Sequence, residues 1–149
     1  AEKAYKDSKL CNLLFARELA RRLRLRGTPM PVLAWSPGLV IPREEGGFFR
    51  YSRRHNPWGQ RLFALVARDL LRITASPQQA GSLLAALATD FVADDGFCYG
   101  ANRLLGPGRL RFELAEPSAE ARDDRLATDL WQVSADLVGL PAELTPAAG

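Results

Sequence analysis

Tyr5 and Lys9 are the two residues whose types and spacing could do chemistry. Residues four apart on a helix project from the same face, one turn from each other. A lysine ammonium close to a phenol stabilises the phenolate and lowers the pKa of the phenol toward neutrality. Such a tyrosine is a usable general acid for protonating a carbonyl or a carbon centre. The spacing also arises by chance, so the alternative is an ordinary exposed pair.

A long helix is predicted to carry this pair, over residues 4–25. Its apolar side chains recur at spacings of three, four and seven and form one stripe: Leu10, Leu13, Leu14, Ala20 and Leu23. Gly27 ends the helix. The apolar run over residues 31–36 suits a strand covered on both faces, as in a parallel sheet, and Pro37-Gly38 ends it.

The rest of the chain alternates helices with short strands. We predict helices over residues 58–73, 76–89 and 118–138, and short strands over residues 97–101 and 110–114. The irregular stretch 39–57 lies between the first strand and the second helix. This order favours an α/β fold. Two or three strands with four helices make a poor sheet alone, so we expect part of a larger domain.

The composition excludes several classes of protein. Apolar residues make up 47% of the 149 residues and charged residues 25%, which is ordinary globular usage and argues against disorder. No run approaches the roughly 18 to 20 apolar residues that a bilayer span needs. Residues 1–9 lack the apolar core of a signal peptide.

The cysteines and the histidine do not predict a metal site. Cys11 and Cys98 are too few and too far apart for a disulfide scaffold or a zinc site, and we expect buried thiols in a reducing, cytoplasmic compartment. His55 has no partner ligands nearby in the sequence.

The net charge is only +3, but the arginines are concentrated in the first part of the chain. No nucleic-acid motif accompanies them, so we expect no nucleic-acid partner. We expect the arginines of the first helix to form its solvated face: Arg17, Arg21, Arg22, Arg24 and Arg26.

The segment Tyr5-Lys-Asp-Ser-Lys-Leu-Cys-Asn12, with the following strand and Pro37-Gly38, resembles the C-terminal half of the short-chain dehydrogenase/reductase family. The ending Trp131-Gln-Val-Ser-Ala-Asp-Leu-Val-Gly-Leu140 matches as well, so the resemblance spans nearly the whole chain. It is closest to the light-dependent branch that reduces a chlorophyll precursor. The fold it implies is the C-terminal half of a Rossmann-like, doubly wound parallel sheet.

The resemblance also implies roles for single residues. Tyr5 would donate a proton to the substrate, and Lys9 would hydrogen-bond the nicotinamide ribose and keep the pKa of Tyr5 low. Pro37, Gly38 and Leu39 would lie against the nicotinamide of the cofactor. That cofactor would be NADPH, which supplies the hydride.

The stretch 39–57 would lie over the substrate. Leu39, Phe48, Arg50 and Arg53 would then contact a small molecule such as a tetrapyrrole, because guanidinium groups suit carboxylates and aromatic rings stack on flat rings. The alternatives are a loop that merely covers the surface and peripheral contact with an anionic, photosynthetic membrane.

The sequence also departs from the family. Leu39 stands where the chlorophyll-precursor branch has a cysteine, and Pro42 stands where the family often has a threonine. No glycine-rich turn cradles a pyrophosphate, and no serine corresponds to the family's catalytic serine. We therefore expect a chain that lacks the nucleotide-binding half and is inactive alone. The rival hypothesis is a non-catalytic relative that binds a tetrapyrrole or a protein; homo-oligomerisation stays open.

Overall fold

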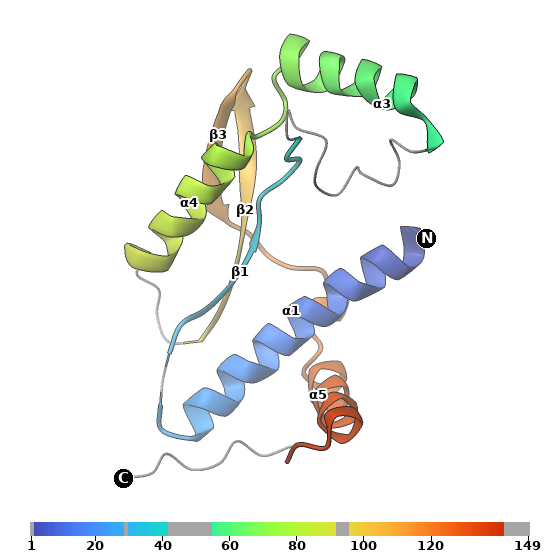
Figure 1. The fold of residues 1–149 in the computed structure, drawn as a ribbon. Coiled ribbons are helices and arrows are strands. Elements are labelled where there is room, and N and C mark those ends of the chain that lie inside the picture. Colours follow the sequence, from blue (N-terminus) through green and yellow to red (C-terminus); the bar gives the residue numbers. More distant parts are fainter. Residues whose placement is uncertain (1, 29, 42–54, 92–95, 142–149) are drawn as a thin grey trace. The chain divides into compact units, whose positions relative to one another are not determined.

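The computed structural model describes residues 2–28, 30–41, 55–91 and 96–141, which form the α/β fold that the sequence predicts. The helices are α1 (Glu2–Leu25), α3 (Pro57–Ala64), α4 (Pro77–Thr89) and α5 (Asp124–Val138), with a π-helix η1 (Leu65–Leu70) and a 3-10 helix η2 (Glu120–Arg122) (Figure 1). The strands are β1 (Val32–Ser36), β2 (Phe97–Gly106) and β3 (Arg109–Leu114).

The strands form one sheet in the order β1-β2-β3. Val32 donates its N–H to the Gly96 carbonyl at 2.9 Å, and the Asn102 side chain donates to the Pro37 carbonyl at 3.1 Å. Residue numbers therefore rise together along β1 and β2, which makes this pair parallel. The two-residue turn 107–108 reverses the chain, so β3 returns antiparallel to β2. All five residues of β1 are only half-buried, so the predicted full cover on both faces is not observed.

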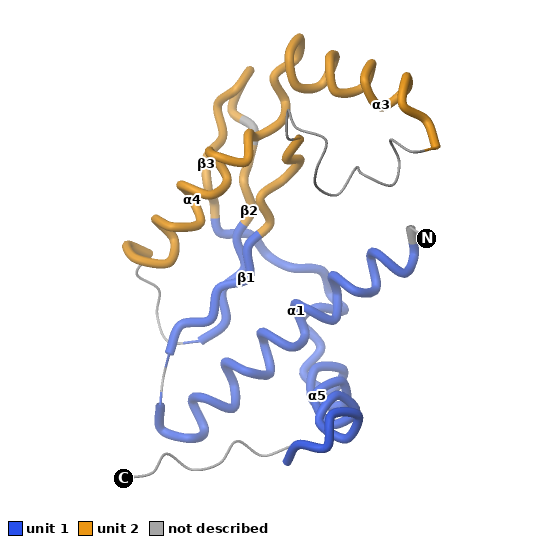
Figure 2. Tube along the Cα trace, viewed as in Figure 1, with its two compact units in different colours: residues 1–35, 93–100, 114–149 blue, residues 36–92, 101–113 orange. Residues whose placement is uncertain are grey.

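The chain divides into two compact units (Figure 2). Unit 1 contains residues 1–35, 93–100 and 114–149, and unit 2 contains residues 36–92 and 101–113.

Unit 1 is built on the packing of α1 against α5. Its buried apolar residues are Leu14, Ala20, Ala121, Ala127 and Ala135. The ring of Phe15 stacks on that of Trp131, with centroids 5.2 Å apart. Because the buried set is mostly alanine, the two helices approach each other through small side chains.

Unit 2 buries Ile41, Ala67 and Ala75 together with the polar Thr74. Within it, residues 39–41 pair in parallel with Ala75: the Ala75 N–H donates to the Leu39 carbonyl at 2.9 Å. This pairing holds the segment that follows β1 beside the segment that precedes α4.

The second predicted helix is interrupted. After α3 the chain continues as the π-helix η1, and the Leu71 N–H bonds to the Val66 carbonyl five residues back. Arg72 then adopts a left-handed conformation with φ 51° and ends the helical run. An arginine carries no sequence signal for this conformation, so the helix was predicted to run on to residue 73.

The last predicted helix, over residues 118–138, is also divided. Its first part is the short 3-10 helix η2, and the Ser118 hydroxyl just before η2 accepts from the Ala121 N–H at 3.3 Å. Asp123 is extended and accepts from the N–H groups of Arg125 and Leu126, so it begins α5 afresh. Gly139, with φ 67°, ends α5 as predicted.

The arginines of α1 do not form the uniformly solvated face that the sequence predicts. Arg21 and Arg22 bind the buried carboxylate of Glu18, and Arg17 pairs with Asp124 at 2.7 Å. The prediction is wrong because Glu18 lies three and four residues before two of these arginines and binds both of them.

The prediction of two buried thiols is also wrong. Cys11 is exposed and Cys98 is half-buried. Residues 3–13 of α1 include no buried residue, and Cys11 is one of the exposed residues of this stretch.

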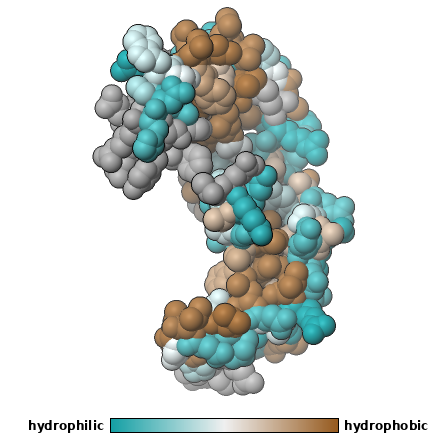
Figure 3. All heavy atoms as spheres, turned by 90° about the vertical axis from the view of Figure 1, so that its right-hand side faces the viewer, coloured by the Kyte–Doolittle hydropathy of each residue, from teal (hydrophilic) through white to brown (hydrophobic). Residues whose placement is uncertain are grey.

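Large apolar side chains remain at the surface, where Figure 3 shows them in brown. Among the described helices, none is both long and apolar enough to cross a bilayer.

Candidate functional site

The first turns of α1 carry Tyr5 and Lys9 on one face, as the spacing predicts. The Lys9 ammonium lies over the Tyr5 ring, 5.3 Å from its centroid. Both side chains are exposed. A cation over an aromatic face is held electrostatically, so the two side chains order each other.

The exposure of this pair follows from where α1 is packed. The buried residues of α1 begin at Leu14, so Tyr5 and Lys9 lie more than one turn before the packed part of the helix. The Ser8 hydroxyl is tied to the backbone, because it donates to the Tyr5 carbonyl at 2.7 Å. The Tyr5 phenol and the three N–H donors of Lys9 are thus accessible to a ligand.

Pro37, Gly38 and Leu39 form the turn that follows β1. Gly38 has φ +75°, a conformation that L side chains rarely adopt. A Cβ at this position would lie 3.8 Å from the Asn102 carbonyl oxygen, which is ordinary contact. Within unit 2, glycine is therefore required by the backbone conformation and not by crowding.

The structure brings only some of the predicted site residues together. Tyr5 and Lys9 belong to unit 1, whereas residues 37–39 belong to unit 2. The predicted substrate contacts at residues 48, 50 and 53 lie outside the described residues. The roles of residues 48, 50 and 53 in substrate binding stay predictions.

Glu18 is a residue that the sequence analysis missed. Its side chain is only 1% exposed and accepts from Arg21 at 2.7 and 2.6 Å and from Arg22 at 2.6 Å. Burial alone would raise the pKa of this carboxyl, but the hydrogen bonds and charges of the two arginines outweigh it and hold the pKa below its usual value. Thr128 on α5 reaches the same carboxylate at 3.5 Å.

A signal for Glu18 was present in the sequence. It lies four residues after Leu14, within the apolar stripe, and is followed at three and four residues by arginine. Arg22 also places its guanidinium over the Trp131 ring, 4.8 Å from the centroid. Glu18, Arg21, Arg22 and Thr128 form a cluster, the Glu18 cluster, which links α1 to α5. This cluster supports the helix that carries Tyr5 and Lys9.

Metal chemistry has no support among the residues that the structure describes, because they include no group of three or more His, Cys, Asp or Glu side chains that could hold an ion.

Proteins similar to this chain are oxidoreductases. The chain is 33% identical over 138 residues to the WW domain-containing oxidoreductase of Drosophila melanogaster, which covers 91% of the chain and 28% of that protein. It is 34% identical over 142 residues to human retinol dehydrogenase 11, covering 94% of the chain and 37% of that protein. It is 31% identical over 140 residues to the chloroplastic protochlorophyllide reductase of Chlamydomonas reinhardtii, covering 94% and 32%. No protein-family model matches the chain.

These relatives confirm the resemblance on which the sequence analysis relied. The chain belongs to the short-chain dehydrogenase/reductase family. It spans about a third of the length of the curated relatives it matches, 28 to 37%.

Proposed function

We propose that this chain carries the proton-donating part of an NADPH-dependent oxidoreductase. The observation that carries the proposal is the Lys9 ammonium lying over the Tyr5 ring on an exposed turn of α1. The family membership of the chain supports an oxidoreductase reaction.

Lys9 of unit 1 and Gly38 of unit 2 are each proposed to contact a nicotinamide cofactor. Lys9 offers exposed N–H donors for ribose hydroxyls, and Gly38 leaves a turn without a side chain. When bound, the cofactor supplies the hydride that a carbonyl or a carbon–carbon double bond accepts. The chain's own residues supply the proton and the positioning.

Tyr5 acts as the general acid in this proposal. Its phenol donates a proton to the substrate atom that gains negative charge, and the phenolate left behind is stabilised by the Lys9 ammonium one turn away. Lys9 also holds the cofactor's ribose, so a single side chain positions the cofactor and favours the proton donor.

The substrate is proposed to be a small, flat molecule such as a tetrapyrrole, contacted by Leu39, Phe48, Arg50 and Arg53. The printed names of the relatives include both a retinol dehydrogenase and a protochlorophyllide reductase. Both classes of substrate therefore belong in the test. We further propose that the protein works in the cytoplasm or at the surface of a photosynthetic membrane.

The experiment uses the natural protein that carries this chain, assayed for NADPH oxidation with retinal and with protochlorophyllide under light. Tyr5→Phe should lower kcat by about 100-fold or more, the scale of general acid catalysis, while NADPH still binds. Lys9→Met should lower kcat and also weaken NADPH binding. Lys3→Met, two residues before Tyr5 and also exposed, is the matched control and should retain activity.

Turnover that survives Tyr5→Phe would exclude Tyr5 as the proton donor. Binding of protochlorophyllide without any NADPH oxidation by the wild type would instead support the non-catalytic rival.

A further inference from the structure

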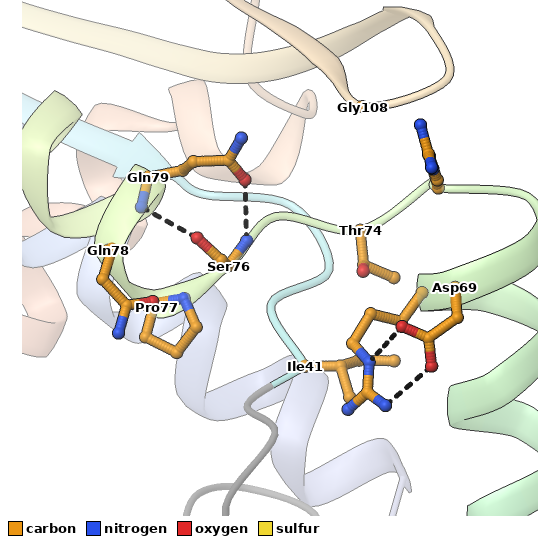
Figure 4. A pocket seen from close by; sticks show the side chains of 10 residues that line it. Ile41, Asp69, Thr74, Ser76, Pro77, Gln78, Gln79 and Gly108 are labelled. Atoms are coloured by element: carbon orange, nitrogen blue, oxygen red, sulfur yellow. Dashed lines mark hydrogen bonds and ion pairs between the residues drawn. The ribbon is translucent and has the colours of Figure 1, made fainter.

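Unit 2 contains a pocket of about 590 Å³ where η1 meets the start of α4 (Figure 4). Its volume lies in the range of sites for small molecules. Among its lining residues are Arg68, Asp69, Arg72, Thr74 and the first turn of α4, Pro77–Gln79.

Thr74 is the unusual residue of this pocket. It is only 8% exposed, and its hydroxyl oxygen is buried without a hydrogen-bond partner among the described residues. A buried hydroxyl normally finds a partner, because leaving it unpaired loses the hydrogen bonds it made to water. Since Thr74 lines the pocket, its missing partner is best supplied by something bound there.

The charges of the pocket favour an anion. Arg68 and Asp69 bind each other through two contacts, at 3.0 and 2.7 Å, and so neutralise each other. Arg72 is the third charged residue of the lining, and within the described part of the chain no ion pair is recorded for it. The lining therefore carries one net positive charge.

The first turn of α4 adds an oriented donor. Ser76 accepts from the Gln79 N–H at 3.1 Å, and the Gln79 side chain accepts from the Ser76 N–H at 2.9 Å, as Figure 4 shows. Pro77 has no N–H. The Gln78 N–H is thus the amide of this turn that the capping box leaves for a ligand, at the positive end of the 13-residue helix.

We propose that this pocket binds the phosphate or carboxylate group of a small molecule. Arg72 supplies the countercharge, and the Thr74 hydroxyl and the Gln78 N–H donate to the oxyanion. The pocket is larger than the group itself, so the rest of the molecule extends along Ile41 and Pro77. The proposal is independent of the oxidoreductase chemistry assigned to Tyr5.

The test is calorimetric titration of the natural protein with inorganic phosphate and, separately, with succinate. Thr74→Val removes the hydroxyl at nearly constant volume, and Arg72→Asn removes the charge while keeping a residue that tolerates the left-handed conformation. Each should weaken binding about tenfold or more, as expected for one hydrogen bond to a charged group. Thr74→Ser keeps the hydroxyl, and Arg61→Asn removes an arginine outside the pocket, so both should bind like the wild type.

The difference in anion affinity between the wild type and the two pocket variants reports on this pocket alone. An anion bound elsewhere would bind equally well to all of these proteins. Phosphate binding that is lost in Thr74→Val and Arg72→Asn supports a phosphate ligand, and the same pattern with succinate supports a carboxylate. Equal binding by all five proteins, or no saturable binding by the wild type, would overturn the proposal.

Discussion

Arg22 donates its Nε–H to the Glu18 carboxylate at 2.6 Å, and Glu18 is the largest side chain that the described residues bury fully. The core of unit 1 therefore contains an ionised group among alanines. Removing one partner of such a pair leaves the other with unsatisfied hydrogen bonds.

Glu18→Gln should lower the free energy of unfolding by about 2 to 3 kcal/mol, because the neutral amide loses charge-assisted hydrogen bonds to Arg21 and Arg22. Urea unfolding followed by circular dichroism measures the loss. Asp129→Asn, which neutralises an exposed carboxylate in the same unit, is the control. Equal stability of the two variants would show that the cluster contributes nothing.

Stability should also depend on pH through Glu18. Its pKa in the folded protein lies below the usual value of 4.5, so the cluster stabilises the fold fully above that value. The contribution is lost as the pH falls from about 4.5 through the lower folded pKa. Urea midpoints measured over this range should fall less steeply in Glu18→Gln than in the wild type, and parallel curves would contradict the assignment.

Ser76→Ala should destabilise unit 2 by about 1 kcal/mol, the usual contribution of an N-cap. The Gln79 N–H loses the hydroxyl oxygen that accepts from it, while the backbone N–H of residue 76 can still donate to the Gln79 side chain. Ser8→Ala changes an exposed serine within α1 and serves as the control. Thermal unfolding distinguishes the two, and an unchanged Tm for Ser76→Ala would mean that α4 does not depend on its cap.

Thr74→Val should raise the stability of the ligand-free protein by about 1 kcal/mol, because it removes a buried hydroxyl that lacks a partner. Thr89→Val removes a hydroxyl that donates to the Ala85 carbonyl and should give no such gain. Urea unfolding in phosphate-free buffer measures both. A loss of stability in Thr74→Val would indicate a hidden partner for the hydroxyl.

Local sequence signals predicted the helix termini well where they were explicit. Ser76-Pro77 marked the start of α4, and Gly139 marked the end of α5. They failed where tertiary context decided the backbone: Arg72 adopts a left-handed conformation without glycine, and Asp123 begins a new helix within a predicted one.

Helical spacing predicted only one part of the candidate site, the placement of Tyr5 and Lys9 on the same face of α1. Four residues along α1 place Lys9 over Tyr5. The phosphate or carboxylate pocket joins residues from η1 and α4 with Ile41, and no periodicity links those segments. Burial of Glu18 likewise depended on α5, which lies more than a hundred residues further along the chain.

The uneven packing of α1 gives the two ends of one helix different local stabilities. From Leu14 onward, side-chain burial and the contacts of Glu18 with Arg21 and Arg22 resist opening, whereas residues 3–13 include no buried side chain and should exchange their amide hydrogens sooner. Tyr5 and Lys9 lie in this part of the helix, where we expect the lower local stability. A molecule that binds to Tyr5 and Lys9 must order the backbone of this part of the helix. Part of its binding enthalpy is therefore offset by the loss of backbone conformational entropy.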